Sequence, residues 1–188
     1  MKKKKIVSLL VLLIMAATGA RAQGTETLTV YDGTAVSNSF PALVQYFNGS
    51  LTKSQFVIPA TDLEAMEGGT ITAMKFYTSS SSSYTTTCNF DVFLKEVDYT
   101  EIYTLEAKSD VVYHGTLSFE AEGGSLTITL TTPFTYKGDN LLIGIENTEE
   151  GTGGEEAISF YGQTVQGASL SGRVDDAMFD VMGENFIP

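Results

Sequence analysis

The sequence has very few of the residues that build cross-links, metal sites and catalytic triads. Among its 188 residues there are one cysteine, one histidine and no tryptophan. A single cysteine excludes an internal disulfide, and one cysteine with one histidine argues against a zinc site made of protein ligands. A triad would depend on His114 alone, and no G-x-S-x-G motif accompanies it. We therefore expect neither an enzyme nor a cofactor.

Basic residues are also scarce, and they are unevenly placed. The chain has 11 Lys and Arg against 23 Asp and Glu, and five of the 11 lie in the first 22 residues, which contain no acid. The remaining 6 basic and 23 acidic residues give the rest of the chain a net charge of −17. Because such a surface repels phosphate groups, we expect no nucleic acid partner and no binding to an anionic membrane.

Only one hydrophobic run is long, and it lies at the N-terminus. Four lysines at 2–5 precede an apolar run over residues 6–17, and Ala20 and Ala22 supply the small residues that signal peptidase accepts. The pattern predicts a signal peptide over residues 1–22, cleaved before Gln23, with Sec-dependent export into the medium or to the outer cell surface. An uncleaved anchor is the alternative, but this run is shorter than the roughly 20 residues that span a bilayer. We expect no transmembrane segment after cleavage.

The rest of the chain has the alternation of β-strands. Residues 126–130 read Leu-Thr-Ile-Thr-Leu, with apolar and polar side chains in strict turn. An Asn48-Gly49 pair predicts a tight hairpin, and residues 61–66 predict one short helical turn. About nine strands at regular spacing, with no long helical pattern, predict an all-β fold. We expect an antiparallel β-sandwich of jelly-roll or related Greek-key topology, as a single domain over residues 23–188.

Two strands carry more detailed predictions. In residues 70–79 the apolar positions change parity between Ile71 and Met74, which indicates a bulge or a strand covered on both faces. In residues 88–97, Cys88 shares a parity with apolar positions, which favours a buried cysteine over a nucleophile. His114 falls on the polar side of its strand, which favours an ordinary surface histidine.

Tyrosines are the first candidate binding residues. A sugar presents an apolar face that stacks on an aromatic ring, and tyrosine combines such a ring with a polar hydroxyl. Tyr84, Tyr99 and Tyr103 lie in or near predicted loops, so they are the candidates for carbohydrate binding. The absence of tryptophan weakens this interpretation, and tyrosines at the edge of the core are the alternative.

Acidic residues supply two further alternatives. Glu149, Glu150, Glu155 and Glu156 flank glycines in one predicted loop and could give Ca²⁺ its oxygen ligands, although the spacing is not that of an EF-hand. A solvated acidic loop explains the same residues. A pair of carboxylates could also hydrolyse a glycoside without histidine, but none of the acids stands in a recognisable motif.

Several short stretches, taken in order, resemble a known family. They are LTVYDGT at 28–34, FVIPA at 56–60, GGTI at 68–71, FDVFLKEV at 90–97, PFTY at 133–136, NLLIG at 140–144, FYG at 160–162 and NFIP at 185–188. Together they resemble a recurrent β-sandwich module of secreted and surface proteins from Bacteroidota. Such modules commonly precede fibronectin type III-like or immunoglobulin-like modules, so the resemblance implies an extracellular, non-catalytic role and further modules C-terminal to Pro188. It also implies a sandwich that ends about one strand short.

These observations lead to one expected function and two alternatives. We expect an exported, non-catalytic cell-surface or secreted module that binds an extracellular glycan or protein and mediates adhesion. The alternatives are an accessory carbohydrate-binding module of a longer hydrolase and a structural spacer. Neither the residues nor the resemblance identifies the ligand.

Overall fold

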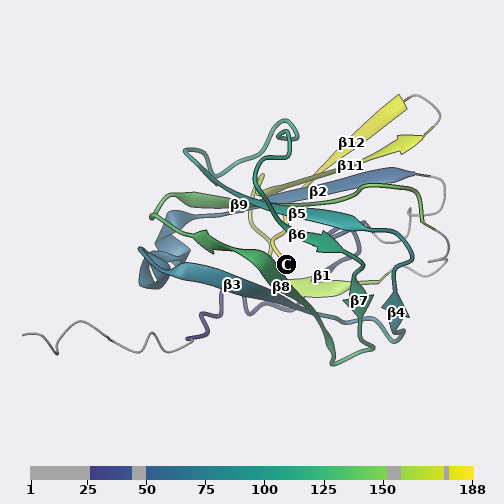
Figure 1. Ribbon diagram of the computed structural model, residues 1–188, viewed down its shortest axis with the longest axis horizontal. Coiled ribbons are helices and arrows are strands. Elements are labelled where there is room, and N and C mark those ends of the chain that lie inside the picture. Colours follow the sequence, from purple (N-terminus) through teal and green to yellow (C-terminus); the bar gives the residue numbers. More distant parts are fainter. Residues whose placement is uncertain (1–25, 44–49, 152–157, 176–177) are drawn as a thin grey trace, which may run out of the picture.

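The computed structural model describes residues 26–43, 50–151, 158–175 and 178–188. The predicted signal peptide and the Asn48-Gly49 turn lie outside these ranges. The prediction of an all-β, antiparallel sandwich is confirmed, and two layers of strands face each other in Figure 1. Twelve strands lie in the described part of the chain, against about nine predicted. Part of the difference comes from strands of two residues, Tyr84–Thr85 and Ser118–Phe119, which are too short to show alternation in the sequence. Another part comes from two strands of seven residues, Ser169–Asp175 and Met178–Glu184, in a stretch rich in Asp and poor in strand pattern.

The first layer is a six-stranded antiparallel sheet. Its order is β12 (Met178–Glu184), β11 (Ser169–Asp175), β2 (Leu51–Ile58), β9 (Asn140–Asn147), β5 (Phe90–Val97) and β6 (Val111–Gly115). Most neighbours in this order are distant in sequence, as Greek-key connections require.

The second layer is assembled from shorter pairs. These are β1 (Ala35–Ser37) with β10 (Phe160–Gly162), β3 (Thr70–Tyr77) with β8 (Ser125–Thr135), and β4 (Tyr84–Thr85) with β7 (Ser118–Phe119). A bridge between Thr78 and Phe160 joins β3 to β10, so β1, β10, β3 and β8 follow one another. Two 3₁₀ turns, Ala60–Asp62 and Glu64–Met66, provide the short helical segment predicted near 61–66.

The main core lies between the two layers. Phe56 on the first layer meets Phe76 on the second in an edge-to-face contact with centroids 6.0 Å apart. Cys88 is buried in this core, as predicted. The parity change in β3 coincides with a shift in its register with β8, between Ile71 and Ala73, which agrees with the first of the two predicted alternatives.

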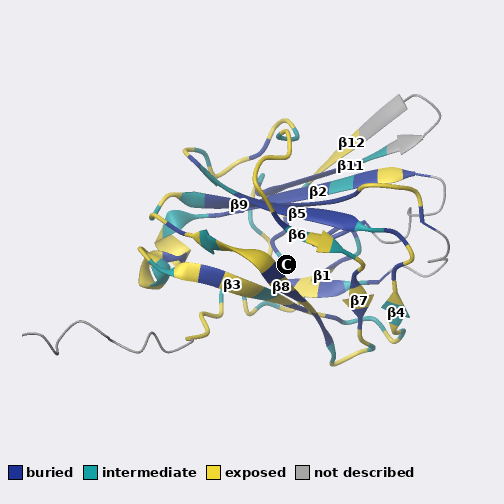
Figure 2. Ribbon diagram, viewed as in Figure 1, coloured by how far each residue is buried: buried dark blue, intermediate teal, exposed yellow. Residues whose placement is uncertain are grey.

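A loop covers part of the outer side of the six-stranded sheet. This loop, residues 98–110, is the teal segment above β9 and β5 in Figure 1. Its Ile102 packs on a second apolar cluster that includes Val57, Phe93 and Leu142. The central strands β5 and β9 are therefore dark blue over most of their length in Figure 2, whereas β3 alternates between buried and exposed residues.

The pairing of β5 with β6 differs from the sequence pattern in one respect. The register shifts between Val92 and Phe93, so Val112 is buried and Val111 is largely exposed. The alternation in residues 111–117 groups Val111 with Tyr113 and Leu117 on the apolar face, and this grouping is wrong for Val111. His114 lies on the outer side, as predicted, and its side chain is 59% exposed.

Candidate functional site

Of the three tyrosines predicted as candidates, one lies in β4 and the other two lie in the loop 98–110. Tyr84 is half-buried in β4 and packs against the main core. Tyr99 packs on the second apolar cluster, and its hydroxyl donates a hydrogen bond to Glu106 Oε1 at 3.0 Å. Burial is the main cause that raises the pKa of Tyr99, and the hydrogen bond to Glu106 adds to it. Tyr103 is 80% exposed and its hydroxyl donates to Glu101.

Two other tyrosines lie side by side, on the outer side of the second layer. The bridge from Thr78 to Phe160, continued by the Ser79 N–H bond to the Ser159 carbonyl at 2.9 Å, sets Tyr77 opposite Tyr161. Tyr161 in turn pairs with Val36 on β1. These side chains are 53%, 37% and 52% exposed, respectively, so a row of apolar and aromatic side chains crosses three strands. We call Val36, Tyr161 and Tyr77 the tyrosine row.

Strand periodicity explains why the row points outward. The preceding residues, Phe76 and Phe160, are buried, and successive side chains of a strand point to opposite faces. Phe160 also meets Phe119 edge to face with centroids 5.8 Å apart. The buried phenylalanines therefore fix the strands that present the two exposed tyrosines.

Polar side chains extend the row along β3 and β8. The Lys75 ammonium lies 5.0 Å from the centroid of the Tyr77 ring, a cation–π distance. Lys75 pairs in register with Thr127, and Ala73 with Thr129; both threonines are exposed. The surface thus combines two rings with hydroxyl groups and one ammonium, without a carboxylate on the strand positions named here. It can stack on an apolar ring face and hydrogen-bond hydroxyl groups.

A second polar feature crosses the outer side of the six-stranded sheet. The register aligns Lys53, Glu146, Asp91 and His114 across four strands. Lys108 from the covering loop reaches Asp91 at 2.5 Å and Glu146 at 3.0 Å, while Lys53 lies 3.2 Å from Glu146. We call these five residues the ionic row.

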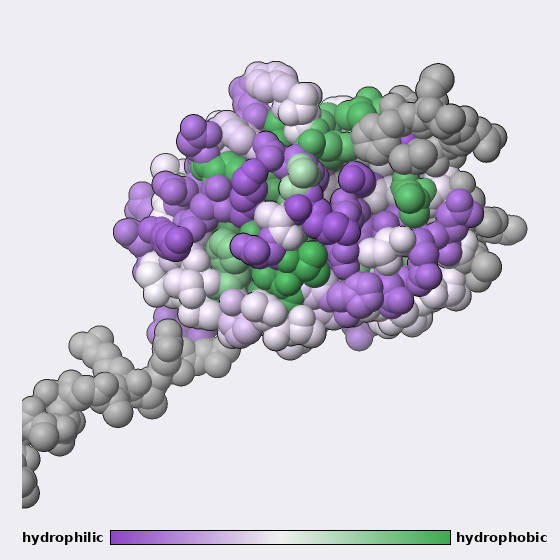
Figure 3. Space-filling view, turned by 45° about the horizontal axis from the view of Figure 1, so that its top comes forward, coloured by the Kyte–Doolittle hydropathy of each residue, from purple (hydrophilic) through white to green (hydrophobic). Residues whose placement is uncertain are grey.

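Contacts within the ionic row shift the pKa values of Asp91 and Lys108. His114 Nδ1 lies 2.7 Å from Asp91 Oδ1. Burial opposes ionisation of Asp91, but hydrogen bonds from Lys108 and His114 outweigh it and hold the pKa of Asp91 below its usual range. The same bonds, to Asp91 and then to Glu146, raise the pKa of Lys108. The ion pairs named here join members of the ionic row to one another, so we interpret the row as a structural ion-pair network. Figure 3 turns this side toward the viewer, with hydrophilic residues around separate apolar patches.

The acidic loop is described only in part. Glu149 Oε1 accepts hydrogen bonds from the Asn89 backbone N–H at 3.3 Å and from its side chain at 3.2 Å, and Glu150 is exposed. Glu155 and Glu156 lie outside the described residues. Among residues 26–43, 50–151, 158–175 and 178–188, no three His, Cys, Asp or Glu side chains gather to hold a metal ion.

Comparisons with known proteins give no further information about the surfaces described above. In the described part of the chain, no helix is both long and apolar enough to cross a bilayer. The sequence signal for the tyrosine row was the repeated Phe-Tyr pair at 76–77 and 160–161, but which strands are neighbours is not visible in a single sequence. No protein-family model, no curated protein and no solved structure matches this chain.

Proposed function

We propose that this protein is an exported, non-catalytic module that binds a glycan on the tyrosine row, at the cell surface or after secretion. The observation that carries the proposal is the placement of Tyr77 and Tyr161 on neighbouring strands, both exposed and both on one sheet face. Rings on adjacent strands are separated by roughly 5 Å at their backbones, so one sugar chain can lie across both.

The surroundings of the row suit a neutral sugar chain. Exposed Thr127 and Thr129 offer hydroxyl groups along β8, and Lys75 offers donors beside the Tyr77 ring. The net charge of −17 that follows residue 22 repels polyanionic chains. A neutral polysaccharide therefore fits this surface better than a sulfated or highly carboxylated one.

Export remains part of the proposal because the signal pattern supports it. The basic residues at 2–5, the apolar run and the small residues before Gln23 have the arrangement of a secretory leader. A glycan-binding surface outside the cell suits either adhesion or the targeting of an attached hydrolase to its polymer.

The test is a comparison of single-tyrosine variants on polysaccharides. The chain from residue 23 is screened against neutral and acidic polysaccharides, and the best binder is titrated by calorimetry. We expect Tyr77→Ala and Tyr161→Ala each to weaken binding by about tenfold, the magnitude of one aromatic contact, and Tyr77→Phe to retain most of it.

Tyr103→Ala is the matched control, because Tyr103 is an exposed tyrosine in the loop on the other layer. It should leave affinity unchanged. Equal affinity of wild type and of the Tyr77→Ala, Tyr161→Ala double variant would refute the proposal, as would loss of binding in Tyr103→Ala.

A further inference from the structure

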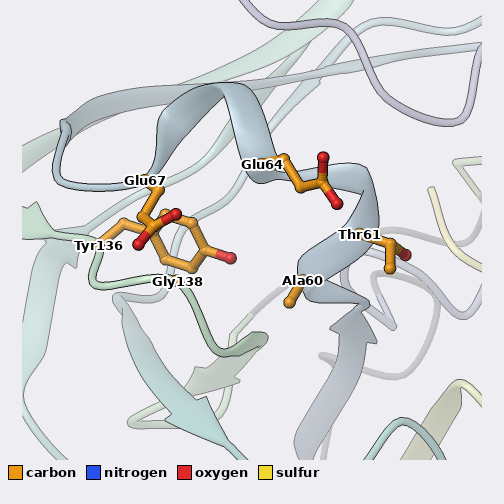
Figure 4. Close-up of a pocket in the computed structure, with 6 residues that line it drawn as sticks. All are labelled: Ala60, Thr61, Glu64, Glu67, Tyr136 and Gly138. Carbon is orange, nitrogen blue, oxygen red and sulfur yellow. The ribbon is translucent and has the colours of Figure 1, made fainter.

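A hollow lies at one end of the sandwich, away from the tyrosine row. Its volume is about 470 Å³, and it is lined by Ala60, Thr61, Glu64, Glu67, Tyr136 and Gly138. The first four belong to the two 3₁₀ turns or follow them, and the last two belong to the turn between β8 and β9 (Figure 4). Two carboxylates thus share the lining with one phenol, and none of the six lining residues is basic.

Tyr136 has an unusual position in this lining. The residue is 0% exposed, yet its hydroxyl has no hydrogen-bond partner among the described residues. Figure 4 shows that hydroxyl directed into the space toward Glu64 and Ala60. A buried hydroxyl without a partner is unfavourable, because it has lost its bonds to water. The hydroxyl therefore has a hydrogen-bonding capacity that no described residue uses.

The backbone holds Tyr136 in this position. Its N–H donates to the Gly69 carbonyl at 3.0 Å, and its carbonyl accepts from the Gly68 N–H at 3.0 Å. These two bonds tie the end of β8 to the segment after the second 3₁₀ turn. The bonds fix the backbone from which the ring projects, and the ring itself is fully buried.

The charges that act on the Tyr136 hydroxyl come from carboxylates, although Lys137 lies exposed in the same turn. Burial first, and then the charges of Glu96, Asp139 and Glu67, raise the pKa of Tyr136. Glu96 is itself fixed, since its Oε1 accepts from the backbone N–H of Lys137 at 2.8 Å and of Asp139 at 3.3 Å. The two charged lining residues, Glu64 and Glu67, favour a cationic ligand, and the phenol oxygen can accept a hydrogen bond from it.

We infer that the hollow binds a primary ammonium group, with the Tyr136 oxygen accepting one N–H and Glu64 and Glu67 balancing the charge. An ammonium carries three donors, which matches one phenol and two carboxylates. A bare metal ion fits less well, because the described residues include no group of three or more acidic, His or Cys side chains placed to hold one.

Entry to the hydroxyl requires one side chain to move. The hydroxyl is out of contact with solvent, whereas Glu67 is exposed and lies against Gly138, where a Cβ would be 3.2 Å from Glu67 Cγ. Because Gly138 has no side chain, the Glu67 side chain can lie against this turn, beside the hollow.

The ammonium could belong to an amino sugar or to a lysine side chain, and the test separates these sources. The chain from residue 23 is titrated by NMR with glucosamine and with Nα-acetyl-lysine methylamide, using N-acetylglucosamine as the uncharged control. We expect at least one amine to shift the Gly138 amide signal and N-acetylglucosamine to leave it unmoved. Stronger binding of glucosamine indicates an amino sugar, and stronger binding of the lysine derivative indicates a peptide.

Two variants keep this inference falsifiable. Tyr136→Phe removes only the unpartnered hydroxyl, so we expect an unchanged or higher melting temperature with about fivefold weaker amine binding. Glu64→Gln with Glu67→Gln should abolish binding, whereas Glu122→Gln, an exposed acid elsewhere, should not. The inference is wrong if neither amine binds or if Tyr136→Phe binds the amine as tightly as wild type. It is also wrong if Ca²⁺ displaces the bound amine when both are present at the same concentration of positive charge.

Discussion

The ring of Phe93 lies directly over Gly144 on the neighbouring strand. The two residues are opposite each other in the register of β5 and β9, and a Cβ on residue 144 would lie 2.2 Å from Phe93 Cζ. Phe93 is completely buried beneath the loop 98–110, so its ring has no space into which to move. Gly144 therefore serves packing rather than backbone conformation.

Gly144→Ala should accordingly destabilise the fold by about 1–3 kcal/mol, the usual cost of overpacking a core. Urea unfolding followed by circular dichroism measures this difference. Gly183→Ala is the control, because a Cβ there would be 3.7 Å from Leu170 Cδ1, an ordinary contact. A Gly144→Ala variant as stable as Gly183→Ala would contradict the packing shown here.

The Gln55 side chain attaches the loop 98–110 to the sheet, because it pairs with one backbone residue of the loop as a neighbouring strand would. Gln55 Nε2 donates to the Glu106 carbonyl at 2.8 Å, and the Glu106 N–H donates to Gln55 Oε1 at 2.8 Å. Gln55→Ala should destabilise the chain by about 1–3 kcal/mol, because it leaves two part-buried backbone groups unpaired. Hydrogen exchange at the Glu106 amide should accelerate. Lys95→Ala removes only an exposed ion pair to Glu106 and should change stability by less than about 1 kcal/mol.

The ionic row predicts how stability depends on acid. The pKa of Asp91 is below its ordinary value of 3.8 in the folded chain. The stabilisation that ionised Asp91 gives the folded chain is therefore complete above pH 3.8. It is lost as the pH falls through the lower pKa that Asp91 has in the folded chain. Melting temperatures should show wild type more stable than Asp91→Asn near pH 6, with the difference shrinking below about pH 4. A difference that is constant from pH 6 to pH 2 would exclude this role for Asp91.

Cys88 should react only when the chain unfolds. Its side chain is buried in the main core, and burial raises the pKa of the thiol, which disfavours the reactive thiolate. Labelling with a disulfide reagent should be slow for the native chain and complete within minutes in denaturant. Rapid labelling of the native chain would mean that this part of the core opens readily.

Local pattern predicted the strands well where one face meets the core and the other meets water. Residues 126–130 alternate in the structure as they do in the sequence, and the parity change after Ile71 marked a real register shift. The outer side of β5 was harder, since Phe93 stands among polar positions at 91 and 95. Only the loop that returns over the sheet explains why it is buried.

The candidate tyrosines were chosen by a local criterion. Tyr84, Tyr99 and Tyr103 were selected for lying near loops; the structure places Tyr84 in β4 and the other two in the loop 98–110, with Tyr99 held by Glu106. Tyr77 and Tyr161 meet because β3 and β10 are neighbours, although 84 positions separate them in the chain. The pairing of distant strands depends on the whole topology, which alternation within one strand cannot supply.

The most direct test of the proposed function is an NMR map of the tyrosine rings. The chain has nine tyrosines, so selective labelling of tyrosine gives a small set of signals that single substitutions can assign. A neutral polysaccharide fragment that binds is titrated into the labelled protein. The account predicts that the ring signals of Tyr77 and Tyr161 shift together and saturate at one affinity, while the signal of Tyr103 stays in place. Saturable binding that moves Tyr103, or any other ring, and leaves both Tyr77 and Tyr161 unchanged would contradict it.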